Sequence, residues 1–174
     1  TGFSVGTGPV TVDVYEDFMC PACGEFETGA AATIDKLVTD GKITVVYHPI
    51  AILDRFSQGT EYSTRASGAA ACAADGGKFA EYHKKTLFAN RPDEGTTGLD
   101  DAKLISLGTG LGLGDPFTQC VQDGKKYKTW SAQITDKASE RGVTGTPTVY
   151  VAGTVLKDRS PTGLTTARRI RGQV

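Results

Sequence analysis

Apolar and polar residues alternate with a period of two in several short stretches of the chain, and these stretches are rich in β-branched side chains. This pattern is typical of half-buried β-strands. It predicts strands at 10–15, 43–47 and 143–151, and a short edge strand at 3–5. Residues 154–156 follow the third strand across a tight turn, which predicts a β-hairpin.

Apolar residues repeat at spacings of three and four between the first two long strands, which predicts a helix that starts near Cys20 and ends before Gly41. A helix that joins two strands of one sheet crosses over with a right-handed turn. We therefore expect the strands at 10–15 and 43–47 to be parallel.

The strand pattern is absent from 57 to 140, where apolar residues recur at helical spacings instead. A last helical pattern covers 162–171. The order of elements is therefore strand–helix–strand, a block of helices, and strand–strand–helix, which indicates an α/β protein. A chain of 174 residues can form one domain with a sizeable insertion and bury a substantial core.

The composition is ordinary for a soluble globular protein, with 39% hydrophobic and 22% charged residues. A net charge of −1 gives no reason to expect nucleic acid or an anionic membrane as a partner. No apolar run approaches the roughly 20 residues that a transmembrane helix needs. The first residues do not resemble a signal peptide, and a leader or lipid anchor removed ahead of them would fit the sequence.

A Cys-x-x-Cys pair lies where the strand at 10–15 gives way to the helix. The first turn of a helix has unpaired N–H groups and about half a positive charge, which stabilise an anion there. Cys20 should therefore ionise more readily than a free thiol, whose pKa is roughly 8.5. Pro21 suits the first helical turn. We expect Cys20 to be the attacking sulfur and Cys23, one turn further in, to be the shielded, resolving sulfur.

Cys72 and Cys120 complete a set of four cysteines. The nearness of Cys20 to Cys23 favours pairing these two with each other, which leaves Cys72 for Cys120. A structural disulfide is the favoured interpretation of the distant pair, and two buried free cysteines are the alternative. A zinc site usually needs two close pairs of ligands, and the distant cysteines have no neighbouring ligand, so we expect no metal site.

Two histidines and a glycine-rich run are further candidates for a catalytic or binding role. His48 closes a strand before a proline, where a polar residue is ordinary, and a proton-shuttle role is the sharper alternative. His83 is expected on the flank of a helix, as packing or surface. The glycine-rich run 108–114 lacks the preceding strand and the Gly-Lys-Ser/Thr ending of a phosphate-binding loop, so a helix stop and restart explains it better.

Four segments together resemble the DsbA-like thiol:disulfide oxidoreductases of the thioredoxin fold, and the resemblance spans nearly the whole chain. They are Cys-Pro-Ala-Cys at 20–23, Gly-Val-Thr-Gly-Thr-Pro-Thr at 142–148, and the segments 71–79 and 113–120 of the helical block. The subgroup that the chain resembles is bacterial, extracytoplasmic and of the actinobacterial type.

The resemblance implies a thioredoxin fold with β-α-β and β-β-α halves and an inserted helical domain. Residues 1–56 and 141–174 would form the discontinuous thioredoxin-like domain, and residues 57–140 would form the insert. A Cys72–Cys120 disulfide would join two helices of the insert.

The resemblance also implies an enzyme that forms disulfides in secreted or envelope proteins through a redox-active Cys20–Cys23 disulfide, with no other cofactor. Pro147 would follow a cis peptide bond, and the backbone of Thr146 would pair with an extended segment of a reduced, unfolded substrate. A membrane protein of the DsbB or vitamin-K-epoxide-reductase type would recycle the enzyme, which would act outside the cytoplasm.

The chain departs from its relatives at the position of the proton carrier. Many relatives carry an acid six residues before the first cysteine, and here that residue is Val14, whereas Asp17 matches the family pattern. A water or Glu16 would then have to deprotonate Cys23.

The two residues between the cysteines, Pro21 and Ala22, should tune the redox potential. The Ala22 side chain cannot hydrogen-bond the Cys20 thiolate, which predicts weaker oxidising power than that of the best-known member of the family.

A disulfide reductase or isomerase of the same compartment is the alternative within this enzyme class. Outside it, the alternatives are a cysteine-based metal-binding module and an inert interaction domain on a thioredoxin scaffold. The presence of both sulfurs of the Cys-x-x-Cys pair disfavours the inert domain.

Overall fold

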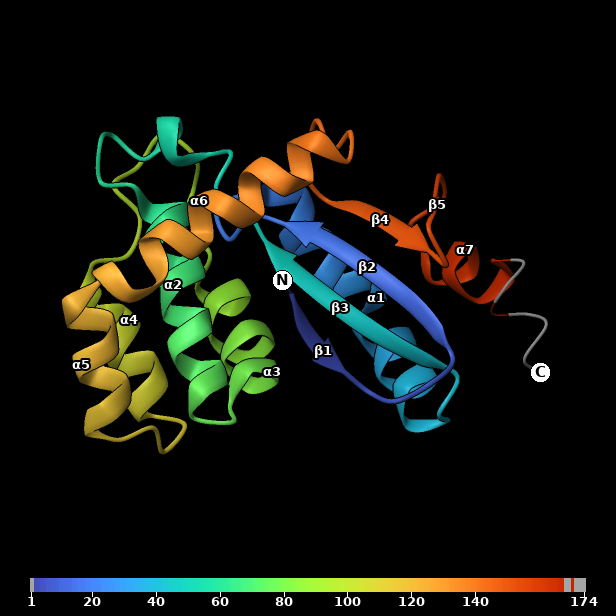
Figure 1. Ribbon diagram of the computed structural model, residues 1–174, viewed down its shortest axis with the longest axis horizontal. Helices are drawn as coiled ribbons and strands as arrows, with labels where there is room; N and C mark the ends of the chain where they lie inside the picture. The colour runs from blue at the N-terminus through green and yellow to red at the C-terminus, as the bar shows by residue number, and fades with distance from the viewer. Residues whose placement is uncertain (1, 168–169, 171–174) are drawn as a thin grey trace.

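The structure is a computed structural model that describes residues 2–167 and 170. Five strands in this part of the chain form one sheet in the order β1-β3-β2-β4-β5 (Figure 1). Their bounds are Phe3–Val5 for β1, Val10–Glu16 for β2, Ile43–Pro49 for β3, Thr148–Val151 for β4 and Thr154–Val155 for β5. The β2 and β3 strands are parallel, as the crossover argument predicts, and the other neighbours pair antiparallel.

Helix α1 (Pro21–Thr39) connects β2 to β3 and lies behind the sheet in Figure 1. It begins directly after Cys20, whose backbone is still extended at φ −72° and ψ 121°, and Pro21 takes the first helical position. The chain leaves the helix through Gly41, whose φ of +67° strains any residue with a Cβ atom. The sequence therefore places the start and the end of this helix correctly.

A block of helices lies beside the sheet, on the left of Figure 1. Apart from the short 3-10 turn η1 (Asp54–Phe56), its regular helices are α2 (Tyr62–Asp75), α4 (Asp101–Thr109), α5 (Asp115–Asp123) and α6 (Lys125–Glu140). The glycine-rich run 108–114 covers the end of α4 and the turn into α5, which agrees with a helix stop and restart. Because α6 packs on both α2 and β3, the division into domains at residues 57 and 140 stays a prediction.

The helical stretch from Phe79 to Asn90 is irregular. It begins as the single turn α3 (Phe79–Glu81), widens into the π-helix η2 (Tyr82–Leu87) and closes as the 3-10 turn η3 (Phe88–Asn90). His83 lies in the π-helical part and is fully buried, which agrees with the predicted packing role and excludes the surface alternative. The reason is tertiary, because neighbouring elements cover this stretch on more than one side.

Strand β4 is shorter than the predicted run 143–151, because it starts only at Thr148. The residues before it form a loop in which the Thr146–Pro147 peptide bond is cis. Proline has no N–H to donate to a strand ladder, so the β-branched pattern there does not become a strand. The hairpin to β5 turns at Ala152 and Gly153, whose φ values of 47° and 80° are those of a tight primed turn.

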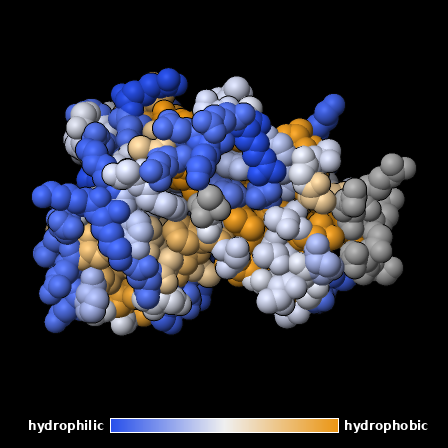
Figure 2. Space-filling model, viewed as in Figure 1, coloured by the Kyte–Doolittle hydropathy of each residue, from blue (hydrophilic) through white to orange (hydrophobic). Residues whose placement is uncertain are grey.

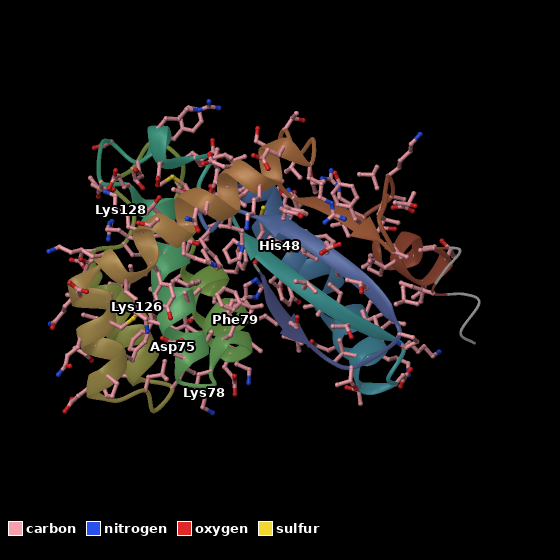
Figure 3. The ribbon with its side chains drawn as sticks, viewed as in Figure 1. His48, Asp75, Lys78, Phe79, Lys126 and Lys128 are labelled. Atoms are coloured by element: carbon pink, nitrogen blue, oxygen red, sulfur yellow. A yellow bond between two sulfur atoms is a disulfide. The ribbon has the colours of Figure 1, made fainter. Side chains whose placement is uncertain are left out.

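The sheet and the helical block share one hydrophobic core. Its buried side chains run from β2, β3 and α1 into α2, α4 and α5. At the boundary, Phe79 stacks on Phe3 with ring centroids 4.3 Å apart (Figure 3). A smaller cluster joins Tyr15 and Ile50 to Ile134 of α6, while the outer side of α6 is hydrophilic (Figure 2).

The closing helix predicted over 162–171 is described in part. Helix α7 (Pro161–Thr166) packs against α1, and residues 168, 169 and 171 lie outside the described residues. None of the helices in the described part of the chain combines the length and the apolar character that a membrane crossing requires.

Cys72 of α2 and Cys120 of α5 form a disulfide with a sequence separation of 48. Replacing both by alanine should lower the free energy of unfolding by about 4 kcal/mol, because the bond restricts the unfolded chain by closing a long loop. Urea denaturation of the oxidised protein measures this difference. The matched control is the Cys20→Ser/Cys23→Ser variant, which opens only a short loop. Equal stability of the alanine variant and the parent would contradict the prediction.

Candidate active site

Cys20 and Cys23 lie at the first turn of α1, just beyond the end of β2. Cys20 is the N-cap residue, and its carbonyl accepts the first helical hydrogen bond from the N–H of Gly24 at 3.2 Å. Both thiols are free. Cys20 keeps 7% of its surface exposed and Cys23 only 1%, so Cys20 is the sulfur that a protein substrate reaches more easily.

The pKa of the Cys20 thiol is lowered to about 6. The largest cause is its hydrogen bond with the Cys23 thiol, whereas burial raises the pKa. The side chain of Thr146 and the backbone N–H groups of Cys23 and Ala22 lower the pKa further. The backbone amides, which the sequence suggests as a main cause, therefore contribute less than the neighbouring thiol. Ala22 acts on the thiolate through its N–H group, not through its side chain.

Burial raises the pKa of the Cys23 thiol far above its ordinary value, and the hydrogen bond with Cys20 and the charge of Cys20 raise it further. Cys23 therefore stays protonated beside the Cys20 thiolate. The two sulfurs have different protonation states at neutral pH, which suits one for attack and departure and the other for resolution.

The loop that carries the cis peptide bond lies against the redox pair. The Cys20 thiol donates to the carbonyl oxygen of Thr146 at 3.4 Å. Arg159, from the segment after β5, donates to the carbonyl oxygen of Pro147, and the Thr148 hydroxyl donates to that of Gly145 at 2.7 Å. Sequence reasoning missed Arg159, because no motif surrounds it and only the fold brings it to this loop.

A hollow of about 260 Å³ adjoins the redox pair and the cis-proline loop. Its lining combines apolar and charged side chains, including Phe26 and Pro147 together with Glu25 and Arg159. A shallow surface of this mixed character suits an extended polypeptide better than a small apolar ligand.

Asp17 fixes the turn between β2 and Cys20. This buried carboxylate accepts hydrogen bonds from the N–H of Met19 at 2.9 Å, the N–H of Leu53 at 3.0 Å and the hydroxyl of Ser63 at 2.7 Å. Burial raises its pKa to about 7, and the three hydrogen bonds counter part of that rise. The guanidinium of Arg91 also donates to the carbonyl oxygen of Met19, at 3.3 Å. The helical block thus holds the turn through Ser63 and Arg91.

The residues weighed as proton carriers have other partners. His48 pairs with Asp13 at 2.8 Å and stacks on Tyr15 (Figure 3). Glu16 is buried and bonds the ring of His83. Within the described part of the chain, no hydrogen bond joins His48 or Glu16 to either redox sulfur.

A family model described as thioredoxin matches residues 6–167. Oxidised DsbA of Mycobacterium tuberculosis superposes with a TM-score of 0.84 at 34% identity, over 99% of this chain and 92% of that chain. The reduced disulfide bond oxidoreductase DsbG of the same organism gives a TM-score of 0.81 at 35% identity, over 97% and 82% of the two chains.

A curated relative is longer than this chain. The serine/threonine-protein kinase PknE of Mycobacterium tuberculosis is 31% identical over 175 residues, which is 94% of this chain and 31% of the kinase. The chain therefore spans about a third of the length of the curated relatives that it matches first.

The fold and the paired sulfurs beside the cis-proline loop define a thiol-disulfide exchange site. The chain belongs to the thioredoxin family and is similar to the DsbA and DsbG enzymes of Mycobacterium tuberculosis.

In the reduced protein, the rate of Cys20 alkylation by iodoacetamide should follow a titration with a midpoint near pH 6, because the thiolate is the reacting form. Replacing Cys23→Ala should raise the midpoint by removing the main hydrogen bond, whereas Cys23→Ser keeps a donor and should raise it less. A parent midpoint close to that of an ordinary cysteine would show that the structure does not acidify Cys20.

Replacing Asp17→Ala should lower the free energy of unfolding by about 3 kcal/mol, because three buried donors lose their acceptor. Urea denaturation at neutral pH measures the change. Asp93→Ala removes an exposed carboxylate and should change stability by no more than about 0.5 kcal/mol. Similar values for the two variants would mean that Asp17 does not fix the turn.

Proposed function

We propose that the chain catalyses disulfide formation in secreted or envelope proteins. The observation that carries this proposal is the geometry of the site, in which Cys20 at the start of α1 lies between the buried Cys23 and the cis-proline loop. The lowering of the Cys20 pKa to about 6 supports it. A thiolate that is stable at neutral pH is a good leaving group. The stability of the reduced pair makes its disulfide an oxidant of other thiols.

In the first step a substrate thiolate attacks the sulfur of Cys20. The Cys20–Cys23 bond breaks, a mixed disulfide forms between the substrate and Cys20, and Cys23 takes up a proton. A second thiolate of the substrate then attacks the substrate sulfur of the mixed disulfide, and Cys20 leaves as a thiolate. Two electrons pass from the substrate to the enzyme, and the exchange needs no cofactor besides the redox disulfide.

The proposed substrates are reduced, unfolded proteins. The backbone of Thr146 pairs with an extended segment, and the mixed hollow beside Phe26 and Arg159 accepts its side chains without strict selection. The enzyme acts outside the cytoplasm, where disulfides such as Cys72–Cys120 persist. A membrane protein of the DsbB or vitamin-K-epoxide-reductase type reoxidises it.

A reductase or isomerase of the same compartment is the second candidate. The observation that favours it is again the pKa of Cys20, because about 6 is nearer to the roughly 7 of thioredoxin than to the roughly 3.5 of DsbA. A less acidic thiolate stabilises the reduced enzyme less and moves the couple toward reduction of substrates.

A redox titration of the Cys20–Cys23 couple against glutathione distinguishes the two directions. We expect a potential between about −200 mV and the roughly −120 mV of DsbA, which is above the roughly −270 mV of thioredoxin. The oxidised protein should also speed the refolding of reduced ribonuclease. A potential near that of thioredoxin, with insulin reduction and no gain in ribonuclease refolding, would support the reductase instead.

Single substitutions of the redox pair should stop the reaction at different steps. Cys20→Ser should abolish ribonuclease refolding, because no sulfur remains to form the mixed disulfide. Cys23→Ser keeps the Cys20 thiolate, which should attack a disulfide of oxidised, scrambled ribonuclease, release one substrate thiolate and accumulate as a mixed disulfide that mass spectrometry detects. Complexes formed equally by both variants would contradict the assignment of Cys20 as the attacking residue.

A further inference from the structure

Three ionisable side chains from separate elements meet in the interior next to the redox loop. Glu16 ends β2, Glu27 lies on α1 and His83 lies in the π-helix η2. One ligand atom from each lies within 4.8 Å of the other two. Their exposed fractions are 1%, 5% and 0%. In the sequence, Glu16 lies four residues before Cys20, and Glu27 lies four residues after Cys23, about one helical turn further along α1.

Most polar atoms of this cluster have no hydrogen-bond partner among the described residues. Glu16 Oε1 and His83 Nε2 lie 2.5 Å apart, but Glu16 Oε2, His83 Nδ1 and both carboxylate oxygens of Glu27 are unpartnered. The buried hydroxyl of Tyr47, whose ring centroid is 4.4 Å from that of His83, is unpartnered as well. A buried polar group without a partner costs about 1–3 kcal/mol, and a charged one costs more.

In the described part of the chain, no lysine or arginine forms an ion pair with Glu16 or Glu27, and Lys84, whose charge acts on the cluster, donates its hydrogen bond to Asp35. Two carboxylates and an imidazole are therefore buried together without a matching cation.

We propose that Glu16, Glu27 and His83 bind a divalent cation of the zinc class. Two carboxylates balance its charge, and a set of imidazole nitrogen and carboxylate oxygen suits Zn²⁺ better than Ca²⁺ or Mg²⁺, which prefer oxygen alone. Tetrahedral ligands at about 2.1 Å from zinc stand roughly 3.4 Å from one another. To reach this geometry, Glu16 Oε1 and His83 Nε2, now 2.5 Å apart, would have to separate by about 1 Å around the cation. A water would take the fourth position.

The cation would act as a structural crosslink beneath the redox loop. It would join β2 and α1, which are consecutive in the sequence, to the distant helical block. A hollow of about 180 Å³ is lined by Asp35, Lys84 and Tyr47, and the Tyr47 ring also contacts His83 of the cluster. The π-helical turn that carries His83 is also of a kind that recurs at functional sites.

Zinc titration of the oxidised full-length chain tests the proposal, because with both cysteine pairs oxidised no thiol competes for the metal. After dialysis against EDTA, calorimetry with Zn²⁺ should give one ion per chain. Thermal unfolding should show a rise in Tm of about 5–10 °C at free Zn²⁺ a hundredfold above Kd, and EDTA should reverse it. The absence of binding, or an equal rise with Ca²⁺ or Mg²⁺, would overturn the proposal.

Glu27→Gln is the sharpest variant, because the Glu27 carboxylate has no hydrogen bond to lose. Its metal-free Tm should equal or exceed that of the parent, and its Zn²⁺-dependent rise should disappear. Glu25→Gln, the same change on the exposed side of α1, should keep the rise. His83→Gln should lose the Zn²⁺-dependent rise in Tm, and His48→Gln should keep it. A rise that survives in Glu27→Gln would place the zinc elsewhere and overturn the assignment.

Discussion

The chemistry of this protein depends on the different surroundings of its two redox thiols. The buried Cys23 thiol stays protonated and stabilises the Cys20 thiolate. This requires the two sulfurs to have different surroundings although they lie on one helical turn. The N-cap position keeps Cys20 at the surface beside backbone N–H groups, and the next turn of α1 carries Cys23 into the core. Every other feature of the site maintains this difference.

The helical block takes part in holding the redox loop. Leu53 and Ser63 donate to the buried Asp17, and Arg91 donates to the carbonyl of Met19, so residues distant in the sequence fix the turn ahead of Cys20. The loop with the cis peptide bond approaches from the opposite end of the chain and is anchored by Arg159. The site is therefore assembled between the sheet and the block, and the core that they share keeps it in place.

The interior beside the redox loop is unusually polar for a protein core. Burial raises the pKa of both Asp17 and Glu27 to about 7. Asp17 is satisfied by three hydrogen bonds, whereas Glu27 has none among the described residues. The contrast separates a carboxylate with a clear structural role from one for which the structure shows no hydrogen-bond partner. The spacing of the cysteines could not predict the proposed metal site, because its ligands are two glutamates and a histidine on β2, α1 and η2.

The sequence by itself determined the order of strands and helices, the parallel pairing of β2 with β3, and the place of Cys20 at a helix start, because these depend on local periodicity and on the residues that begin and end helices. Only the tertiary structure decided the surroundings of each group. It buried His83 against Glu16 and delayed the start of β4 until Thr148, after the cis proline. It also placed the Cys23 thiol where it lowers the pKa of Cys20 most. Such effects depend on which distant side chains share an interior of low polarity, and local patterns carry no record of those contacts.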